Sequence, residues 1–179
     1  MTKEVLSQKF KEHFVKDEGL RFFVSPGRVN LIGEHIDYNG GDVFPCALDI
    51  GTYAVARRRD DRTLSFASVN FPLRASLCVD ELRFDASLDW INYPSGVAAM
   101  MRDQGVQAGG MDILFYGDLP AGAGLSSSAS IELAMAVAVN ELYGVGLSVT
   151  DLVKIAQRAE NEFVGVNCGI MDQFAIGAC

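Results

Sequence analysis

The sequence has little of what a zinc protein needs. It contains only two histidines and four cysteines, which are His13, His35, Cys46, Cys78, Cys168 and Cys179. No two cysteines have CxxC spacing, so the sequence offers no zinc-binding pattern. Reduced thiols in an intracellular protein are the simplest explanation of these cysteines, and we expect a cytoplasmic location.

Long apolar segments are also absent. The longest apolar stretches, such as Leu133–Val139, end well before the roughly 18 residues that a membrane span needs. The amino-terminal segment Met1–Val15 mixes lysine and glutamate with its apolar residues, which is not the pattern of a signal peptide. We therefore expect no membrane partner, and we expect an amphipathic helix over Met1–Val15.

Basic residues are outnumbered by acidic ones. The chain has 15 Lys and Arg against 23 Asp and Glu, which gives a net charge of −8. This balance argues against a nucleic-acid partner, because such proteins present a broad basic surface. With 49% apolar residues and no low-complexity tract, the chain of 179 residues is long enough for one folded domain or for part of a larger protein.

Periodicity predicts a mixture of helices and strands. Further helices are expected at Ile91–Met101, Ala129–Tyr143 and Asp151–Phe163, the last one capped by Ser148 or Thr150. Strands are expected at Leu20–Ser25, ending at Pro26, at Met111–Tyr116, and as two or three antiparallel strands between Val43 and Val69 that are joined by the solvated charged turn Arg57–Arg62.

The last residues, Ala175–Cys179, form an apolar run without a polar tail or a helix cap. This is an unusual end for a protein. We therefore expect a truncated chain, with a second domain beyond residue 179.

Two glycines stand directly before the predicted helix at Ala129–Tyr143, within the segment Leu119–Ser130. Glycines let backbone N–H groups approach an anion, and the start of a helix adds free donors and a partial positive charge. The segment lacks the Gly-Lys-Ser/Thr of a Walker A loop and the third glycine of a Rossmann fingerprint. It predicts a phosphate-binding loop, although a tight strand-to-helix turn capped by serine would use the same residues.

A second glycine-bounded segment, Gly27–Gly41, concentrates polar side chains. They are Arg28, Asn30, Glu34, His35, Asp37, Tyr38 and Asn39. Carboxylates accept hydrogen bonds from sugar hydroxyls, and histidine donates or accepts them, so this set suits a polyol. Each residue alone could instead be a solvated, ion-paired or packing residue.

Acidic residues and a glycine turn make a third cluster at Glu160–Phe174. Phosphoryl transfer uses one carboxylate to hold a metal and another to act on the attacking hydroxyl. Solvated acids at a helix end are the alternative. Cys168 lies in the cluster without an adjacent base, which favours packing over a role as nucleophile.

The segment Pro120–Ala129 resembles the second signature of the GHMP kinases, Pro-x-x-x-Gly-Leu-Ser-Ser-Ser-Ala. The resemblance implies that the loop wraps the phosphates of ATP. The implied ATP-binding residues are Gly122, Ala123, Gly124, Leu125, Ser126, Ser127 and Ser128. It also implies that a hydroxyl, either Ser128 or Ser127, coordinates Mg²⁺, an ion that favours hard oxygen ligands.

Within this family, Gly27–Asn39 matches the signature of the galactokinases, Gly-Arg-x-Asn-Leu-Ile-Gly-Glu-His-x-Asp-Tyr-Asn. The match implies that Glu34, His35 and Asp37 contact galactose hydroxyls and that Ile36 lies in the same binding segment. It further implies that Arg28 lies near the reacting phosphoryl group.

The order of residues in the third cluster is similar to that of galactokinases, too. It implies that Asp172 of the Gly-Ile-Met-Asp-Gln segment is the catalytic base beside the C1 hydroxyl. Glu160 is then the magnesium carboxylate, and Glu162 is a surface acid.

The resemblance implies an α+β fold in which residues 1–179 form the amino-terminal domain, of the ribosomal protein S5 domain 2-like type, and a carboxy-terminal ferredoxin-like domain is missing. The implied reaction is ATP-dependent phosphorylation of α-D-galactose at the C1 hydroxyl, with Mg²⁺ as cofactor and galactose and ATP as partners. A sensor of the same family that binds both ligands without turnover, or an inactive fragment of the kinase, is the alternative. The oligomeric state stays open.

Overall fold

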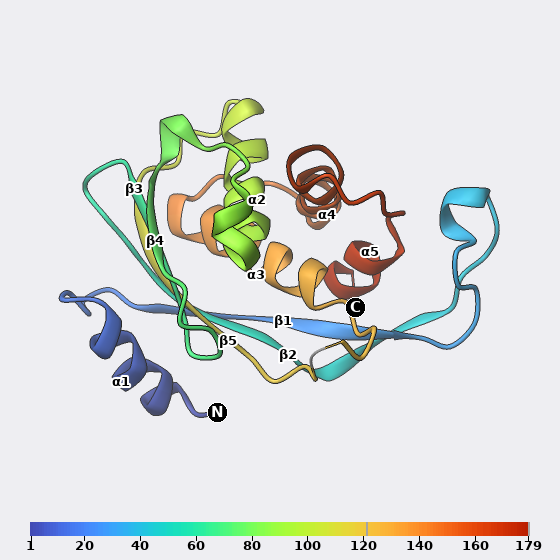
Figure 1. Cartoon of the computed structure of the whole chain (residues 1–179), viewed down its shortest axis with the longest axis horizontal. Helices are drawn as coiled ribbons and strands as arrows, with labels where there is room; N and C mark the ends of the chain where they lie inside the picture. Colours follow the sequence, from blue (N-terminus) through green and yellow to red (C-terminus); the bar gives the residue numbers. More distant parts are fainter. Residues whose placement is uncertain (121, 179) are drawn as a thin grey trace.

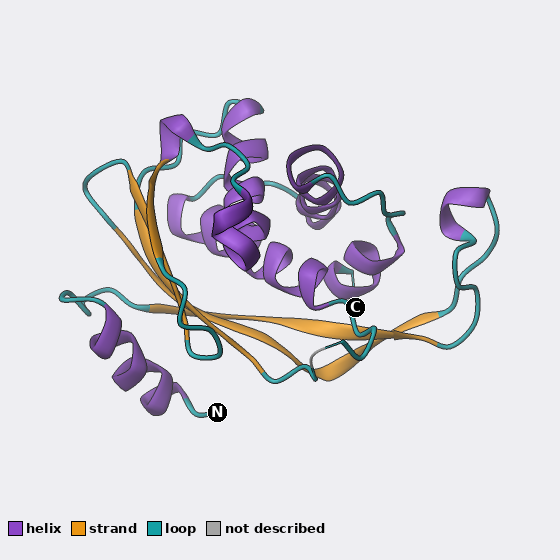
Figure 2. Ribbon diagram, in the orientation of Figure 1, coloured by secondary structure: helices purple, strands orange, loops and turns teal. Residues whose placement is uncertain are grey.

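A computed structural model describes residues 1–120 and 122–178 of the chain. Ala121 of the predicted phosphate loop and the terminal Cys179 lie outside the described residues. The fold combines one five-stranded sheet with helices on both of its faces (Figures 1 and 2). No helix of the described part of the chain is long and apolar enough to cross a membrane.

The strands are β1 (Arg21–Asn30), β2 (Pro45–Arg58), β3 (Thr63–Ser68), β4 (Ala75–Cys78) and β5 (Met111–Gly117), in the sheet order β1-β2-β5-β3-β4. The α-helices are α1 (Lys3–His13), α2 (Asn92–Asp103), α3 (Ser127–Tyr143), α4 (Val149–Arg158) and α5 (Met171–Gly177). Three 3₁₀ segments, η1 (Asp37–Asn39), η2 (Val79–Glu81) and η3 (Ala86–Ile91), and one π-helical segment, η4 (Ala159–Val164), complete the order.

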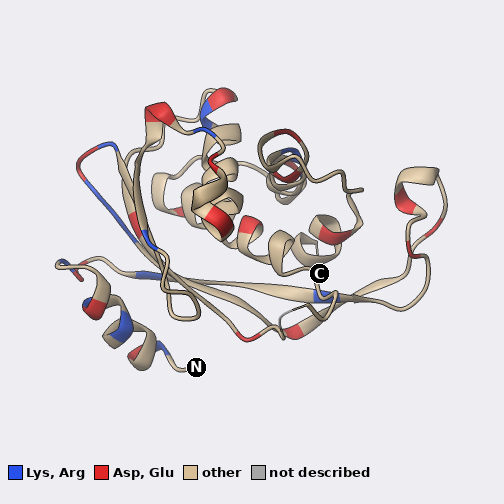
Figure 3. Cartoon of the chain, in the orientation of Figure 1, with Lys and Arg blue, Asp and Glu red and all other residues tan. Residues whose placement is uncertain are grey.

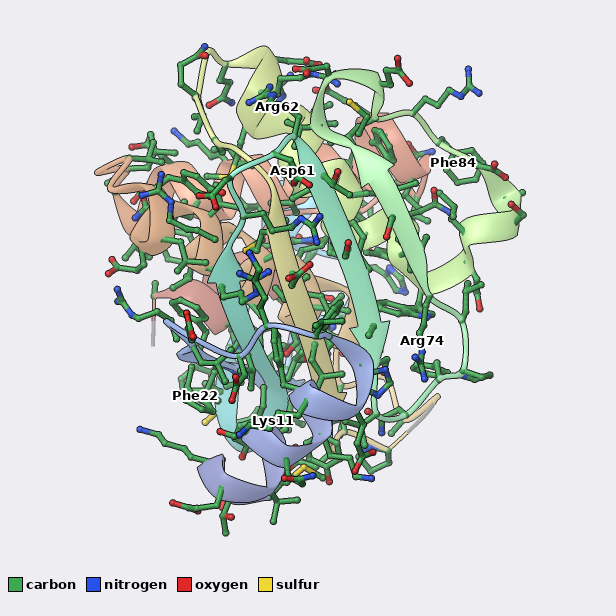
Figure 4. All side chains as sticks on the ribbon, turned by 90° about the vertical axis from the view of Figure 1, so that its left-hand side faces the viewer. Lys11, Phe22, Asp61, Arg62, Arg74 and Phe84 are labelled. Carbon is green, nitrogen blue, oxygen red and sulfur yellow. The ribbon has the colours of Figure 1, made fainter. Side chains whose placement is uncertain are left out.

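The sheet separates two apolar cores. Met111, Ile113 and Phe115 of β5 face the larger core under α2, α3 and α4, whereas Leu114 faces a smaller core with Phe10 of α1. This alternation follows from the two-residue period of a strand. Figure 4 shows α1 lying across one end of the sheet, on the face that carries Leu114, with Asp61 and Arg62 at the other end of the strands.

The predicted antiparallel pairing of the strands between residues 43 and 69 is wrong in one respect. β2 and β3 are not hydrogen-bonded neighbours, because β5 lies between them, antiparallel to β2 and parallel to β3. β5 suits the centre of the sheet because its apolar residues are buried on both faces. The buried Asp112 of β5 also forms ion pairs with Arg57 at 2.6 Å and Arg59 at 2.7 Å. The charged turn Arg57–Arg62, predicted to be solvated, is therefore bound to the sheet in part.

The first strand does not end at Pro26, contrary to the prediction. β1 continues to Asn30, with a register irregularity between Pro26 and Arg28. A proline is tolerated here because β1 is an edge strand, where a missing N–H leaves no ladder bond unmade. The continuation carries Arg28 under the start of α3.

The predicted helices are confirmed, with changes at their ends. Ser148 caps α4 in a capping box with Asp151, whereas Thr150 lies inside the helix. The helix predicted to reach Phe163 changes at Ala159 into the π-helical η4. The seven-residue α5 was not predicted, because one apolar turn after a glycine loop has too few periods to identify as a helix.

A substitution at Gly51 of β2 tests the close packing of β2 against β1 near Pro26, where the register is irregular. A Cβ atom at residue 51 would lie 2.1 Å from the Ser25 carbonyl oxygen, so we expect Gly51→Ala to lower the free energy of unfolding by about 1–3 kcal/mol. Gly117→Ala, in β5, is the matched control because a Cβ there meets nothing within 4 Å. Urea denaturation of both variants measures the difference, and equal stability would contradict this packing.

Candidate active site

An ion pair between Arg28 and Asp172 lies where the three polar segments meet. Arg28 projects from β1, and Asp172 lies in the first turn of α5. Arg28 Nε lies 2.7 Å and Nη2 2.6 Å from Asp172 Oδ1. Arg28 is buried, so this carboxylate is the counter-charge that its guanidinium needs.

The predicted phosphate loop joins the same ion pair. Arg28 Nη1 donates to the Gly124 carbonyl oxygen at 2.6 Å, and the backbone N–H of Arg28 donates to the Leu125 carbonyl oxygen at 3.2 Å. Ser126 Oγ donates to Asp172 Oδ2 at 2.5 Å. Both carboxylate oxygens of Asp172 are therefore held, one by Arg28 of the segment Gly27–Gly41 and the other by Ser126 of the loop.

The backbone of the loop takes unusual conformations. Gly122 and Gly124 have φ values of 70° and 67°, which glycine adopts without a steric penalty. Ser126 also has a positive φ, 56°, and its side chain makes no capping hydrogen bond to α3. Ser126 therefore does not cap α3 with its side chain, and such strain in a non-glycine residue is typical of functional sites.

Three buried polar side chains lie behind the loop. Gln173 Nε2 donates to Glu160 Oε2 at 2.6 Å and lies 3.4 Å from Glu132 Oε2. The pKa of Glu160 is raised overall, mainly by burial and also by the charge of Asp172. Hydrogen bonds from the Ser128, Cys168 and Gln173 side chains offset part of this rise. Ser128 and Glu160, the two predicted metal ligands, are thus neighbours in the structure.

Glu132 was not predicted from the sequence. It is fully buried on α3, and burial together with the charge of Glu160 raises its pKa to about 10. Its Oε1 atom has no hydrogen-bond partner within the described part of the chain. The signal missed was a glutamate among the apolar residues in the first half of this helix, where a buried carboxyl group must be neutral or partnered.

Cys168 lies next to the same acids. Its Sγ is 3.5 Å from Glu160 Oε2, and burial raises the pKa of the thiol to about 12. The thiol is therefore protonated at neutral pH, which agrees with the prediction of a packing residue and not a nucleophile.

Asp37 connects the sugar segment to the third cluster. Its Oδ2 accepts a hydrogen bond from the Met171 backbone N–H at 3.1 Å, at the start of α5. A Cβ atom on Gly169 would fall 1.7 Å from the same oxygen, so the glycine makes this approach possible. Asp37, in η1, thereby lies against the residue that precedes Asp172.

Glu34 and His35 lie in the connection between β1 and β2, which extends beyond the helices (Figure 1). Both are exposed, and His35 Nδ1 lies 2.7 Å from Tyr38 Oη. Ile36 is half-buried and packs against Gly41 within the loop. Within the described residues, no hydrogen bond joins these three side chains to Asp172, unlike Arg28 and Ser126.

A cavity of about 500 Å³ opens beside Ser127 and Ser128. Its wall includes Phe71, Trp90 and Tyr93, which the sequence analysis did not select. The rings of Phe71 and Trp90 are stacked at 6.3 Å, and Trp90 Nε1 is buried without a hydrogen-bond partner in the described structure. The single tryptophan of the chain, just before a predicted helix, was the available signal.

Basic residues lie on α1, on the turn between β2 and β3 and on α4, whereas α3 and α5 carry none (Figure 3). The described residues contain no group of three or more His, Cys, Asp or Glu side chains that could hold a metal ion. One carboxylate and one hydroxyl, Glu160 and Ser128, fit Mg²⁺ only when phosphate and water complete its shell.

Two family models match the chain. The model for the GHMP kinases N terminal domain matches residues 92–178, and the galactokinase galactose-binding signature matches residues 8–58. The chain belongs to the GHMP kinase family. The fold and the family predicted from the sequence are thereby confirmed.

Curated relatives are similar over nearly the whole chain. Galactokinase of Clostridium tetani is 51% identical over 94% of this chain, and galactokinase of Bacillus subtilis is 52% identical over 98%. These alignments cover 44% and 46% of the two relatives. This GHMP kinase chain therefore spans a little under half the length of the curated relatives it matches.

Solved structures agree with this family assignment. The structure of Lactococcus lactis galactokinase complexed with galactose has a TM-score of 0.93 and 43% identity, covering 97% of this chain and 46% of that one. Methanococcus jannaschii mevalonate kinase has a TM-score of 0.78 at 19% identity, covering 90% of this chain and 52% of that one, which is a likeness of fold alone.

The buried Glu132 predicts a pH dependence of stability in this kinase domain. Its pKa rises from 4.5 to about 10 on folding, so the folded state holds a proton that the unfolded state releases. The stability of the folded state therefore falls as the pH rises from about 4.5 towards about 10.

We expect Glu132→Gln to flatten this slope and to raise the free energy of unfolding at pH 8 by more than about 1 kcal/mol. Glu141→Gln, at an exposed position on the same helix, is the control and should leave the slope unchanged. Urea titrations at several pH values without Mg²⁺ measure both, and a parallel slope in Glu132→Gln would show that this carboxyl is ionised.

Proposed function

We propose that the gene product containing this chain transfers the γ-phosphoryl group of ATP to the C1 hydroxyl of α-D-galactose, giving galactose 1-phosphate and ADP. One observation carries the proposal. The Asp172 carboxylate is held by Arg28 from the sugar segment and by Ser126 from the phosphate loop, so a base, a cation and a phosphate cradle adjoin each other.

Asp172 is the base of the proposed reaction. Its carboxylate takes the proton of the C1 hydroxyl as the C1 oxygen bonds to the γ-phosphorus and the bond from that phosphorus to the bridging β–γ oxygen breaks. ADP leaves with that oxygen. Arg28 stabilises the charge on the transferred group, because a fixed guanidinium already lies against the loop.

The loop Gly122–Ser128 binds the phosphates in this proposal, with the start of α3 supplying backbone donors. The adenine ring lies in the adjoining cavity between the aromatic side chains of Phe71 and Tyr93, near Trp90. The unpartnered Trp90 Nε1 supports this placement, since a buried donor gains a partner when a ring nitrogen of adenine fills the cavity.

Glu160 and Ser128 would hold Mg²⁺ together with phosphate oxygens and water. The bound ion supplies neutralisation of the charge that builds up between the β- and γ-phosphates. The observation that supports the fit is a buried carboxylate beside a hydroxyl, with the charge of Asp172 acting on the same carboxylate.

Galactose recognition is assigned to Glu34, His35, Ile36 and Asp37. Asp37 supports this assignment best, because its bond to Met171 brings it next to the turn that carries Asp172. The galactose complex of the Lactococcus lactis relative is the similar structure that supports this ligand.

The full gene product, incubated with ATP, Mg²⁺ and galactose, should release ADP only when the sugar is present. Binding of both ligands without ADP release would favour the sensor alternative. The same assay on the 179-residue chain tests the inactive-fragment alternative, which predicts turnover by the full gene product alone.

Asp172→Asn should lower kcat by about 10²–10⁴-fold, the usual contribution of a general base, while galactose binding changes little. Asp151→Asn is the matched control, because Asp151 lies in the first turn of the neighbouring helix α4, where it only caps the helix. Steady-state kinetics and sugar titrations measure both variants. An undiminished kcat in Asp172→Asn would remove this residue from the role of base.

Glu160 and Glu162 form a second matched pair. Glu160→Gln should raise the Mg²⁺ concentration needed for half-maximal activity by about tenfold or more, because a magnesium carboxylate is lost. Glu162 is exposed and pairs with Arg158 at 2.9 Å, so Glu162→Gln should leave the magnesium dependence unchanged. Equal magnesium curves for the two variants would contradict the assignment of Glu160.

A further inference from the structure

The turn that leads into α2 is closed by one buried side chain, Asn92. Its Oδ1 accepts a hydrogen bond from the Asp85 backbone N–H at 3.1 Å, and its Nδ2 donates to the carbonyl oxygens of Asp85 at 2.8 Å and Asp89 at 3.1 Å. Asn92 is only 2% exposed. All three bonds go to the backbone of the preceding turn, so the carboxamide acts as a clamp across it.

The clamp holds an unfavourable backbone conformation. Asp89 has φ 43° and ψ −120°, a region that residues with a side chain seldom adopt and that persists only when surrounding bonds enforce it. The carbonyl oxygen of Asp89 is one of the two that Asn92 holds. An aspartate at residue 92 would place carboxylate oxygens against both carbonyls, so the amide nitrogen is essential to the clamp.

Two cavity-lining aromatic residues flank the clamp in sequence, Trp90 two residues before Asn92 and Tyr93 one residue after it. Trp90 lies 6.3 Å from Phe71 and 6.0 Å from Phe115, between ring centroids, in a stacked and an edge arrangement. The conformation of the turn therefore decides where both residues project into the cavity beside Ser128.

We infer that Asn92 is a positioning residue for the nucleoside part of ATP: by closing the Asp85–Asn92 turn, it places Trp90 and Tyr93 in the wall of the nucleotide cavity. The inference rests on the proposed function. It assigns Asn92 an effect on ATP binding and none on galactose binding, since the sugar segment lies on the loop between β1 and β2.

The test compares Asn92→Ala and the milder Asn92→Ser with Asn140→Ala in the full gene product. Asn140 clamps another turn in the same manner, since its Oδ1 accepts from Leu147 N–H at 2.9 Å and its Nδ2 donates to Leu147 O at 3.3 Å. That turn joins α3 to α4 and does not line the cavity. Asn140→Ala therefore controls for loss of stability alone.

We expect both Asn92 variants to raise the KM for ATP about fivefold or more and to leave the KM for galactose within about twofold. Asn140→Ala should change neither KM. Binding of ADP is measured independently through Trp90, whose emission is isolated by subtracting the spectrum of Trp90→Phe. The Asn92 variants should need a correspondingly higher ADP concentration for the same change in emission.

An unchanged KM for ATP in a folded Asn92→Ser protein would overturn the inference while leaving the proposed function intact, and so would an equal rise of both KM values. A wild-type protein that neither binds ADP nor phosphorylates galactose would overturn the proposed function itself, and the inference with it.

Discussion

The pairing of Arg28 with Asp172 constrains the rest of the site, because it joins residues 144 positions apart in the sequence. A buried guanidinium is stable only when a counter-charge and hydrogen-bond acceptors surround it. Asp172 supplies the charge, and the Gly124 carbonyl supplies another acceptor. The edge strand β1, the loop before α3 and the short helix α5 are therefore fixed relative to one another by one side chain.

The acids around this pair outnumber the cations. Glu160 and Glu132 lie behind the loop, and the charges of Asp172 and Glu160 each raise the pKa of a neighbouring carboxyl. Glu132 is protonated in the folded state at neutral pH, so Asp172 and Glu160 are the acids whose charge matters here. In the proposed reaction, Mg²⁺ would offset part of the negative charge that ATP adds beside them.

Local patterns predicted most helices and the main polar segments, because periodicity, glycine spacing and acid clusters are properties of neighbouring residues. The place of β5 between β2 and β3 was missed, since it depends on pairing between strands that are far apart in the sequence. Glu132 and the aromatic cavity were missed for the same reason: their partners come from distant parts of the chain. The positions of Asp172 and Arg28 in one pair could be expected only through the family resemblance.

Phosphorus NMR of the full gene product with ATP, Mg²⁺ and galactose tests the central claim most directly, because it identifies the atom that receives the phosphoryl group. We predict a new phosphomonoester resonance that couples to the anomeric proton of galactose and grows as the γ-phosphate signal of ATP declines. A phosphoryl group found on another hydroxyl, or inorganic phosphate as the sole product, would contradict the account.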